Sequence, residues 1–288
     1  MRLLHSLPPY NFGGLEPELA DFKKAKVVVL PVPYDSTVCY TSGTRNGPHA
    51  IITASRQMEL YDAEMGWEPA EVGIHTLDEL EPSRDSPIET HRRVEKTVQE
   101  ILENKKFPVV LGGEHSISIG AVKAVSKLYD NLTVLQLDAH SDLRDEFEGT
   151  KFGHSSVMRR ISEVCHTVQA GIRSMSKEEA EFAKNKKLQI FPPHSSQPKK
   201  ITEELKRNVY VTIDLDVFDP SEVPGVGTPE PGGLRWNEVL SIIKEVASKR
   251  NVVGFDVVEL CPIPGETHSE FLAAKLIYKF ISYIFKSV

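Results

Sequence analysis

Short apolar runs alternate with longer amphipathic segments along this chain of 288 residues. The runs have strand length and little polar alternation, which is typical of strands buried on both faces of a parallel sheet. The predicted strands are residues 27–30, 72–74, 108–111, 132–137, 166–172, 188–191, 209–213 and 252–258. Between them, apolar residues recur at helical spacing, and the predicted helices include 47–60, 87–106, 116–129, 154–161 and 271–285. This alternation predicts an α/β fold built on a parallel sheet.

No repeat, low-complexity tract or linker divides the chain. We therefore expect a single domain over residues 1–288, with an amino-terminal arm at 1–25 and an α/β/α core at 26–288. The start of the chain lacks the basic and apolar segments of a signal peptide. Two lysines interrupt the apolar segment at 271–285, which favours a buried helix over a membrane span.

The composition, 40% hydrophobic and 26% charged, is that of an ordinary globular protein. The net charge of −7 is spread along the chain, which argues against nucleic acid as a partner and is compatible with a cationic substrate. Cys39, Cys165 and Cys261 are odd in number and far apart, which favours reduced thiols over a disulfide framework. We expect a cytoplasmic protein that binds neither nucleic acid nor membrane.

Three possible metal ligands follow the strand at 132–137. Asp138, His140 and Asp142 alternate with two small residues, so an extended backbone points all three side chains the same way. A polar strand end with a helix cap is the plainer interpretation for a lone Asp-x-His pair. Three titratable groups in this arrangement would repel or desolvate one another without a cation between them, which favours a metal site.

Two further predicted strands end in similar chemistry. The strand at 108–111 runs into Gly112-Gly113-Glu114-His115, and the strand at 209–213 runs into Asp214 and Asp216. Each end taken alone is more often a turn or a surface acid pair than a ligand site. The carboxyl ends of parallel strands meet at one edge of a sheet, where such proteins bind ligands. Carboxylates and imidazoles without a thiolate suit a hard divalent ion.

These segments also resemble the metal-binding signatures of the ureohydrolase (arginase/agmatinase) family. The similarity covers nearly the whole chain, in the family's order. It is carried by Ser42-Gly43-Thr44-Arg45-Asn46-Gly47-Pro48-His49-Ala50-Ile51, Gly112-Gly113-Glu114-His115, Asp138-Ala139-His140-Ser141-Asp142, Asp214-Leu215-Asp216-Val217-Phe218-Asp219-Pro220, Gly227-Thr228-Pro229-Glu230-Pro231-Gly232-Gly233-Leu234 and Gly254-Phe255-Asp256-Val257-Val258-Glu259.

The resemblance implies one three-layer α/β/α domain with an eight-stranded parallel sheet and a site for two Mn²⁺ per subunit. It further implies self-association to a trimer or hexamer. Carried over residue by residue, one ion would be held by His115, Asp138, Asp142 and Asp214, and the other by His140, Asp138, Asp214 and Asp216. Asp138 and Asp214 would then bridge the two ions.

The implied reaction is hydrolysis of a guanidinium group to urea and an amine. Asp142 would orient the attacking water, and Glu259 matches the family's guanidinium-binding glutamate, which pairs with two N–H groups. His154 matches the position assigned to proton shuttling, and an imidazole suits that task at neutral pH. The chain has His154-Ser155 where many members have His-Gly, as one agmatinase branch does.

Substrate choice is expected to depend on the loop after Asp142. Arginases place an Asn and a Ser there to hold the substrate carboxylate, whereas this chain has Arg144 and Thr150, and its loop resembles agmatinases. Acids at 145, 146 and 148 would attract a distal ammonium or form a solvated acidic loop. Arg144 would favour a guanidino acid if it faced the pocket. Agmatine is the favoured substrate, and a guanidinobutyrase-like or arginase-like activity is the alternative. A non-catalytic metal-binding member is more distant, since no ligand is missing.

Overall fold

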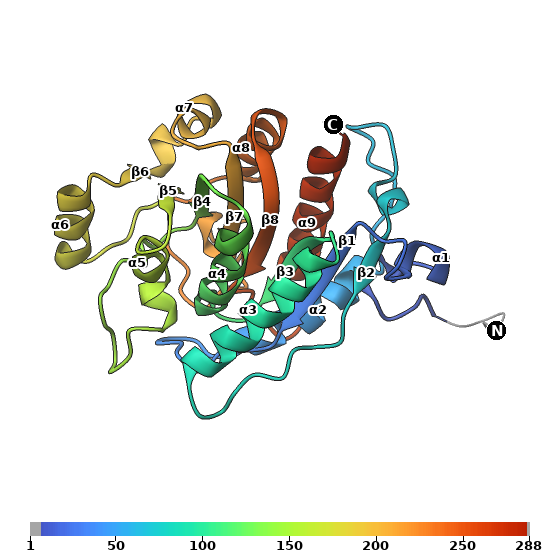
Figure 1. The fold of residues 1–288 in the computed structure, drawn as a ribbon, viewed down its shortest axis with the longest axis horizontal. Coiled ribbons are helices and arrows are strands. Elements are labelled where there is room, and N and C mark those ends of the chain that lie inside the picture. Colours follow the sequence, from blue (N-terminus) through green and yellow to red (C-terminus); the bar gives the residue numbers. More distant parts are fainter. Residues whose placement is uncertain (1–6, 287–288) are drawn as a thin grey trace.

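The computed structural model describes residues 7–286 and confirms a single parallel sheet of eight strands (Figure 1). The strand order is β2-β1-β3-β8-β7-β4-β5-β6, so the four strands β3, β8, β7 and β4 lie at its centre. The strand bounds are β1 Val27–Val32, β2 Ile74–Thr76, β3 Phe107–Gly112, β4 Leu132–Leu137, β5 His166–Ala170, β6 Gln189–Phe191, β7 Asn208–Asp214 and β8 Asn251–Val258.

Helices cover both faces of this sheet (Figure 1). Their bounds are α1 Pro17–Ala20, α2 Gly47–Ser55, α3 Pro87–Glu103, α4 Ser118–Leu128, α5 Val157–Ile161, α6 Lys177–Lys186, α7 Pro198–Glu203, α8 Trp236–Lys249 and α9 His268–Lys286. Val27 and Val29 of β1 pack in one core cluster with α2, α8 and α9. Val28 and Leu30 pack in a second cluster with α3, α4 and α5. Successive residues of a strand point to opposite faces of the sheet, so β1 contributes side chains to both core clusters.

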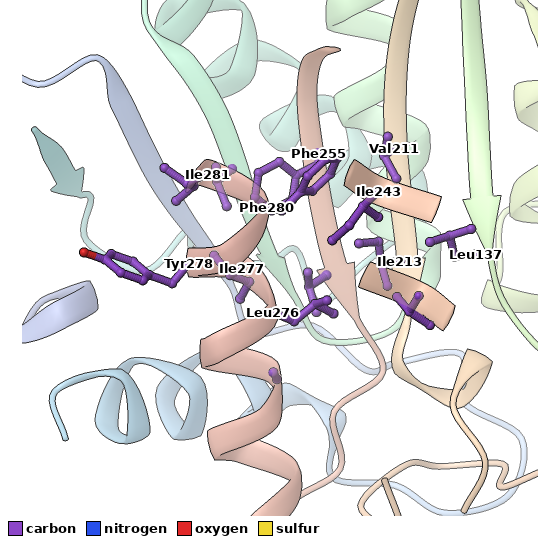
Figure 2. Close-up of a cluster of buried hydrophobic side chains, with 14 of the residues drawn as sticks. Leu137, Val211, Ile213, Ile243, Phe255, Leu276, Ile277, Tyr278, Phe280 and Ile281 are labelled. Carbon is purple, nitrogen blue, oxygen red and sulfur yellow. The ribbon is translucent and has the colours of Figure 1, made fainter. Parts of the chain in front are cut away.

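Figure 2 shows the cluster between the central strands and the carboxy-terminal helix. Phe255 of β8 packs against Phe280 of α9, with 4.7 Å between the ring centroids. Ile213 of β7 and Ile243 of α8 are buried in the same cluster. Burial of each such side chain contributes about 1.5–3 kcal/mol. These contacts hold the central strands, whose carboxyl ends carry the candidate ligands.

The ends of several elements differ from the predictions. α4 begins at Ser118, because His115–Ile117 form a separate 3₁₀ turn and the Ser116 hydroxyl donates to Glu114. The segment assigned to an arm is partly packed: Phe12 and Leu15 are buried in the cluster that contains α2 and α9. A large apolar side chain gains more from that burial than from exposure, so this part of the segment joins the core.

The two glycines before Glu114 are required by close packing. A Cβ on Gly113 would lie 2.0 Å from the carbonyl oxygen of Tyr34, and one on Gly112 would lie 2.6 Å from a methyl of Val258. Any larger residue would force the strand end away from its neighbours. The glycines thus allow the turn that carries His115 to sit against β8.

The carboxy-terminal apolar segment forms the buried helix α9. Among residues 7–286, no helix has the length and apolar character needed to cross a membrane. Lys279 is buried in α9, and its ammonium lies 2.9 Å from Asp62 Oδ1 and also contacts Glu64. A buried cation is tolerated when it is paired, so this lysine does not interrupt the packing.

Candidate metal centre and active site

The candidate ligands meet at the carboxyl ends of the four central strands. His115 follows β3, Asp138 follows β4, Asp214 ends β7, and Glu259 follows β8. These residues lie far apart in the chain, but the strand order β3-β8-β7-β4 places them side by side. The parallel sheet thus assembles the predicted site at one edge, as its topology requires.

The first cluster surrounds His115, which is buried. Its Nδ1 lies 3.1 Å from an oxygen of Asp138, 3.2 Å from one of Asp142 and 3.3 Å from one of Asp214. Yet this nitrogen makes no hydrogen bond to any residue that the structure describes. A nitrogen lone pair among three carboxylate oxygens is a suitable arrangement for holding a cation.

The second cluster contains His140, Asp216 and Asp138. His140 Nδ1 lies 2.8 Å from Asp216 Oδ2 and 3.8 Å from Asp138 Oδ1. One ligand atom from each of these residues falls within 4.8 Å of the others, and the same holds for His115, Asp138 and Asp214. Asp138 belongs to both sets. Two His/Asp sets with a shared carboxylate match a binuclear metal centre.

The electrostatics of the cluster also favour a cation. Burial raises the pKa of Asp138 well above its ordinary value, and the charges of Asp216 and Asp142 raise it further. Burial opposes protonation of His140, but the hydrogen bond and charge of Asp216 raise its pKa to about 11. Buried carboxylates in mutual contact are costly unless positive charge compensates them. The donor set of carboxylates and imidazoles fits hard divalent ions.

Hydrogen bonds fix the orientation of these carboxylates. Asp138 Oδ1 accepts from the backbone N–H of His140 at 2.6 Å, and Asp138 Oδ2 accepts from Gln136 Nε2 at 2.6 Å. Asp216 Oδ1 accepts from the backbone N–H of Ala139 at 2.9 Å. The ligand atoms are therefore held in place by the protein itself.

A cavity of about 280 Å³ opens onto both clusters. Its wall includes Glu259, whose Oε1 accepts from the backbone N–H of His115 at 2.6 Å. Burial raises the pKa of Glu259 well above its ordinary value, and the charges of Asp214 and Glu114 add to the rise. His154 also lines the cavity, and burial lowers its pKa. Both residues thus lie where a substrate bound beside the clusters would meet them.

The residues predicted to contact the substrate differ in whether they line the cavity. Arg144 lines the cavity, with its guanidinium 4.7 Å from the ring centre of Phe147 and its Nε 3.9 Å from a Glu179 oxygen. Thr150 is not part of the cavity wall, and its hydroxyl accepts from the backbone N–H of Phe152. Asp145 is also outside the wall and pairs with Arg160 at 2.6 Å. The structure therefore brings only Arg144 of these to the cavity.

Sequence reasoning missed several residues around the site. Glu179 lines the cavity. In the sequence, its position three residues after Ser176 indicates only a capping box at the start of a helix. Residues 38–41 form part of the cavity wall, but a loop without titratable clusters offers no sequence signal. Thr212 and Asp256 lie behind His115, and Asp256 falls within a motif quoted above. Their roles depend on contacts across strands.

Comparisons with known proteins agree with this geometry. A model of the Arginase family matches residues 25–282. An N(1)-aminopropylagmatine ureohydrolase of Synechocystis sp. is 39% identical to this chain, and the similarity covers 97% of each chain. An agmatinase of Bacillus cereus is 37% identical, over 88% of this chain and 89% of the agmatinase. The crystal structure of an agmatine ureohydrolase from Thermoplasma volcanium superposes with a TM-score of 0.88 at 33% identity, covering 98% of this chain and 96% of the other. The chain therefore belongs to the arginase family of ureohydrolases, whose members are binuclear metal enzymes.

Proposed function

We propose that this chain is a manganese-dependent ureohydrolase that releases urea from agmatine. The observation that carries the proposal is that two His/Asp sets share Asp138, and that His115, His140 and Glu259 line one cavity beside them. The proposed ligands are those inferred from the family motifs: His115, Asp138, His140, Asp142, Asp214 and Asp216. Two Mn²⁺ ions held there would supply Lewis-acid activation of a water molecule.

The side chains around the clusters have separate roles in this proposal. Glu259 binds the guanidinium, because a carboxylate accepts two N–H donors of that planar group. Its backbone contact with His115 fixes it next to the metal ligands. Asp142 orients the attacking water and passes its proton towards the leaving nitrogen. His154 carries protons between the cavity and solvent, since its imidazole lines the cavity beside the clusters.

Charge at the cavity wall supports a substrate without a carboxylate. Arg144 is the cation that would receive such a group, but it already stacks on Phe147 and lies beside Glu179. A carboxylate left partly desolvated and unpaired would cost about 3 kcal/mol, or roughly a hundredfold in kcat/KM. N(1)-aminopropylagmatine is a second candidate substrate, because the Synechocystis relative, which is 39% identical in sequence, is named as an N(1)-aminopropylagmatine ureohydrolase.

A urea-release assay tests the proposal, with agmatine, N(1)-aminopropylagmatine, arginine and 4-guanidinobutyrate, each with and without added Mn²⁺. We expect Mn²⁺-dependent release from the first two substrates, at roughly a hundredfold higher kcat/KM than from the two acids. Arg144→Ala should leave this order unchanged. Arg159→Ala is the matched control, because Arg159 stacks on Phe182 outside the cavity. Turnover of the guanidino acid that equals agmatine turnover, and is lost only in Arg144→Ala, would contradict the assignment.

The proposed enzyme works in the cytoplasm, as its three widely spaced cysteines favour. It assembles as a trimer or hexamer, as the family resemblance implies. Light scattering at micromolar concentration measures the mass in solution. A mass equal to that of one 32.2 kDa chain would overturn this part of the proposal.

A further inference from the structure

A buried chain of hydrogen bonds extends behind His115, on the side away from the acid cluster. His115 Nε2 lies 2.8 Å from the hydroxyl oxygen of Thr212. That hydroxyl donates to Asp256 Oδ1 at 2.5 Å, and the Tyr210 hydroxyl donates to Asp256 Oδ2 at 2.8 Å. Thr212 on β7 and Asp256 on β8 are direct partners in the sheet register, and all four side chains are buried. The chain of contacts is therefore held by the two central strands.

The direction of these bonds determines where His115 carries its proton. Thr212 has a single hydroxyl proton, which it donates to Asp256, so towards His115 it acts only as an acceptor. His115 Nε2 must then be the donor, with a hydrogen on it. Its Nδ1 is left to face Asp138, Asp142 and Asp214, where it makes no hydrogen bond. A metal ion requires this unprotonated nitrogen.

We propose that Asp256 is a positioning residue for the metal centre, which acts through Thr212 to keep the His115 lone pair on Nδ1. The inference rests on the proposed function, in which His115 is a metal ligand. Imidazole ligands are generally oriented in this way by an acceptor on their other nitrogen, and loss of that acceptor weakens metal binding about 10–100-fold. Here the acceptor is a neutral hydroxyl whose direction a buried carboxylate imposes. The ion beside His140 lacks His115 as a ligand and should be less affected.

The experiment is a Mn²⁺ titration against a competing chelator, with bound metal counted by mass spectrometry. Thr212→Val removes the acceptor while keeping the shape of the side chain. Asp256→Asn leaves one acceptor oxygen and one amide donor for the two hydroxyls of Thr212 and Tyr210, so Asp256 no longer fixes the direction of the Thr212 proton. Thr167→Val is the matched control, because Thr167 is a buried strand residue whose hydroxyl has no hydrogen-bond partner in the part of the chain that the structure describes. Thr212→Ser keeps the hydroxyl and serves as the rescue variant.

We expect Thr212→Val and Asp256→Asn to bind one of the two ions roughly 10–100-fold more weakly and the other nearly normally. Thr167→Val and Thr212→Ser should bind both ions like the wild type, and circular dichroism identifies any variant that fails to fold. If Thr212→Val does not fold, Asp256→Asn provides the same comparison. Equal affinity in Thr212→Val, Asp256→Asn and Thr167→Val would overturn the inference alone. A wild-type protein that binds no Mn²⁺ would overturn it together with the proposed function.

Discussion

One carboxylate oxygen of Glu179 binds the residues on both sides of Asp142. Glu179 Oε1 accepts from the Ser141 hydroxyl at 2.7 Å and from the backbone N–H of Leu143 at 2.9 Å. Asp142 between them has a φ of 52°, in the left-handed region that costs a non-glycine residue about 1–2 kcal/mol. The other oxygen of Glu179 accepts from the backbone N–H of Ser176 at the start of α6. The first turn of α6 thus stabilises the strained backbone of a candidate metal ligand.

We therefore predict that Glu179→Ala lowers urea release at least tenfold, because the residues on both sides of Asp142 lose their hydrogen bonds to Glu179. Ser176→Ala is the control, since it also removes a cap of α6 but leaves the carboxylate in place. It should cost about 1 kcal/mol of unfolding free energy and leave activity within about twofold. Steady-state kinetics and urea denaturation of both variants make the comparison. Equal activity in the two variants would show that Glu179 acts only as a helix cap.

Asp138 should govern the binding of both metal ions, because it is the residue common to the two His/Asp sets. We expect Asp138→Asn to bind less than one Mn²⁺ per chain at concentrations that saturate the wild type. Asp216→Asn should retain one ion, since Asp216 belongs to one set only. Metal analysis after dialysis gives both numbers. Two ions retained by Asp138→Asn would be incompatible with a shared ligand.

Lys279 should contribute strongly to stability. Its ammonium is buried beside Asp62, which is itself only 3% exposed, so Lys279→Met leaves that carboxylate buried without its partner. The expected loss is about 3–5 kcal/mol of unfolding free energy. Lys244→Met is the control, because Lys244 pairs with Glu64 from a half-exposed position and should cost less than about 1 kcal/mol. Chemical denaturation measures both, and equal losses would contradict the argument.

His91 should make stability depend on pH. Burial, with a smaller effect from Lys123, lowers the pKa of His91 on α3 to about 3, and its ring nitrogens have no hydrogen-bond partner among residues 7–286. Below a pH of about 6.5 the unfolded chain binds a proton that the folded chain does not, so stability is full above that pH and falls as pH drops towards 3. At pH 5 this costs about 2 kcal/mol.

The measurement is the free energy of unfolding at pH 8 and pH 5 for the wild type, His91→Leu and His194→Gln. The wild type should lose about 2 kcal/mol more than His91→Leu between these pH values. His194 is exposed, so His194→Gln should follow the wild type. A His91→Leu variant with an unchanged pH dependence would exclude His91 as the source.

Much of the fold follows from local pattern. The apolar runs at 27–30 and 132–137 became β1 and β4, because a strand buried on both faces needs apolar residues at successive positions. Boundaries were less well predicted. α4 starts two residues late because His115 turns into the acid cluster, and Phe12 joins the core although nothing in the local sequence distinguishes it from a surface residue.

The sequence by itself determined the ligand chemistry of this protein. Asp138, His140 and Asp142 alternate with small residues directly after a buried strand, and this pattern predicted their use as ligands. The extended backbone expected there was wrong at Asp142, whose φ of 52° is left-handed. Only the tertiary structure decided which groups support and flank that chemistry. Thr212 reaches His115 because β3, β8, β7 and β4 are neighbours in the sheet. Glu179 reaches Ser141 and Leu143 because the first turn of α6 contacts the loop that follows β4. Arg144 lies beside Glu179 for the same reason, since a contact between residues far apart in the chain is not encoded in local pattern.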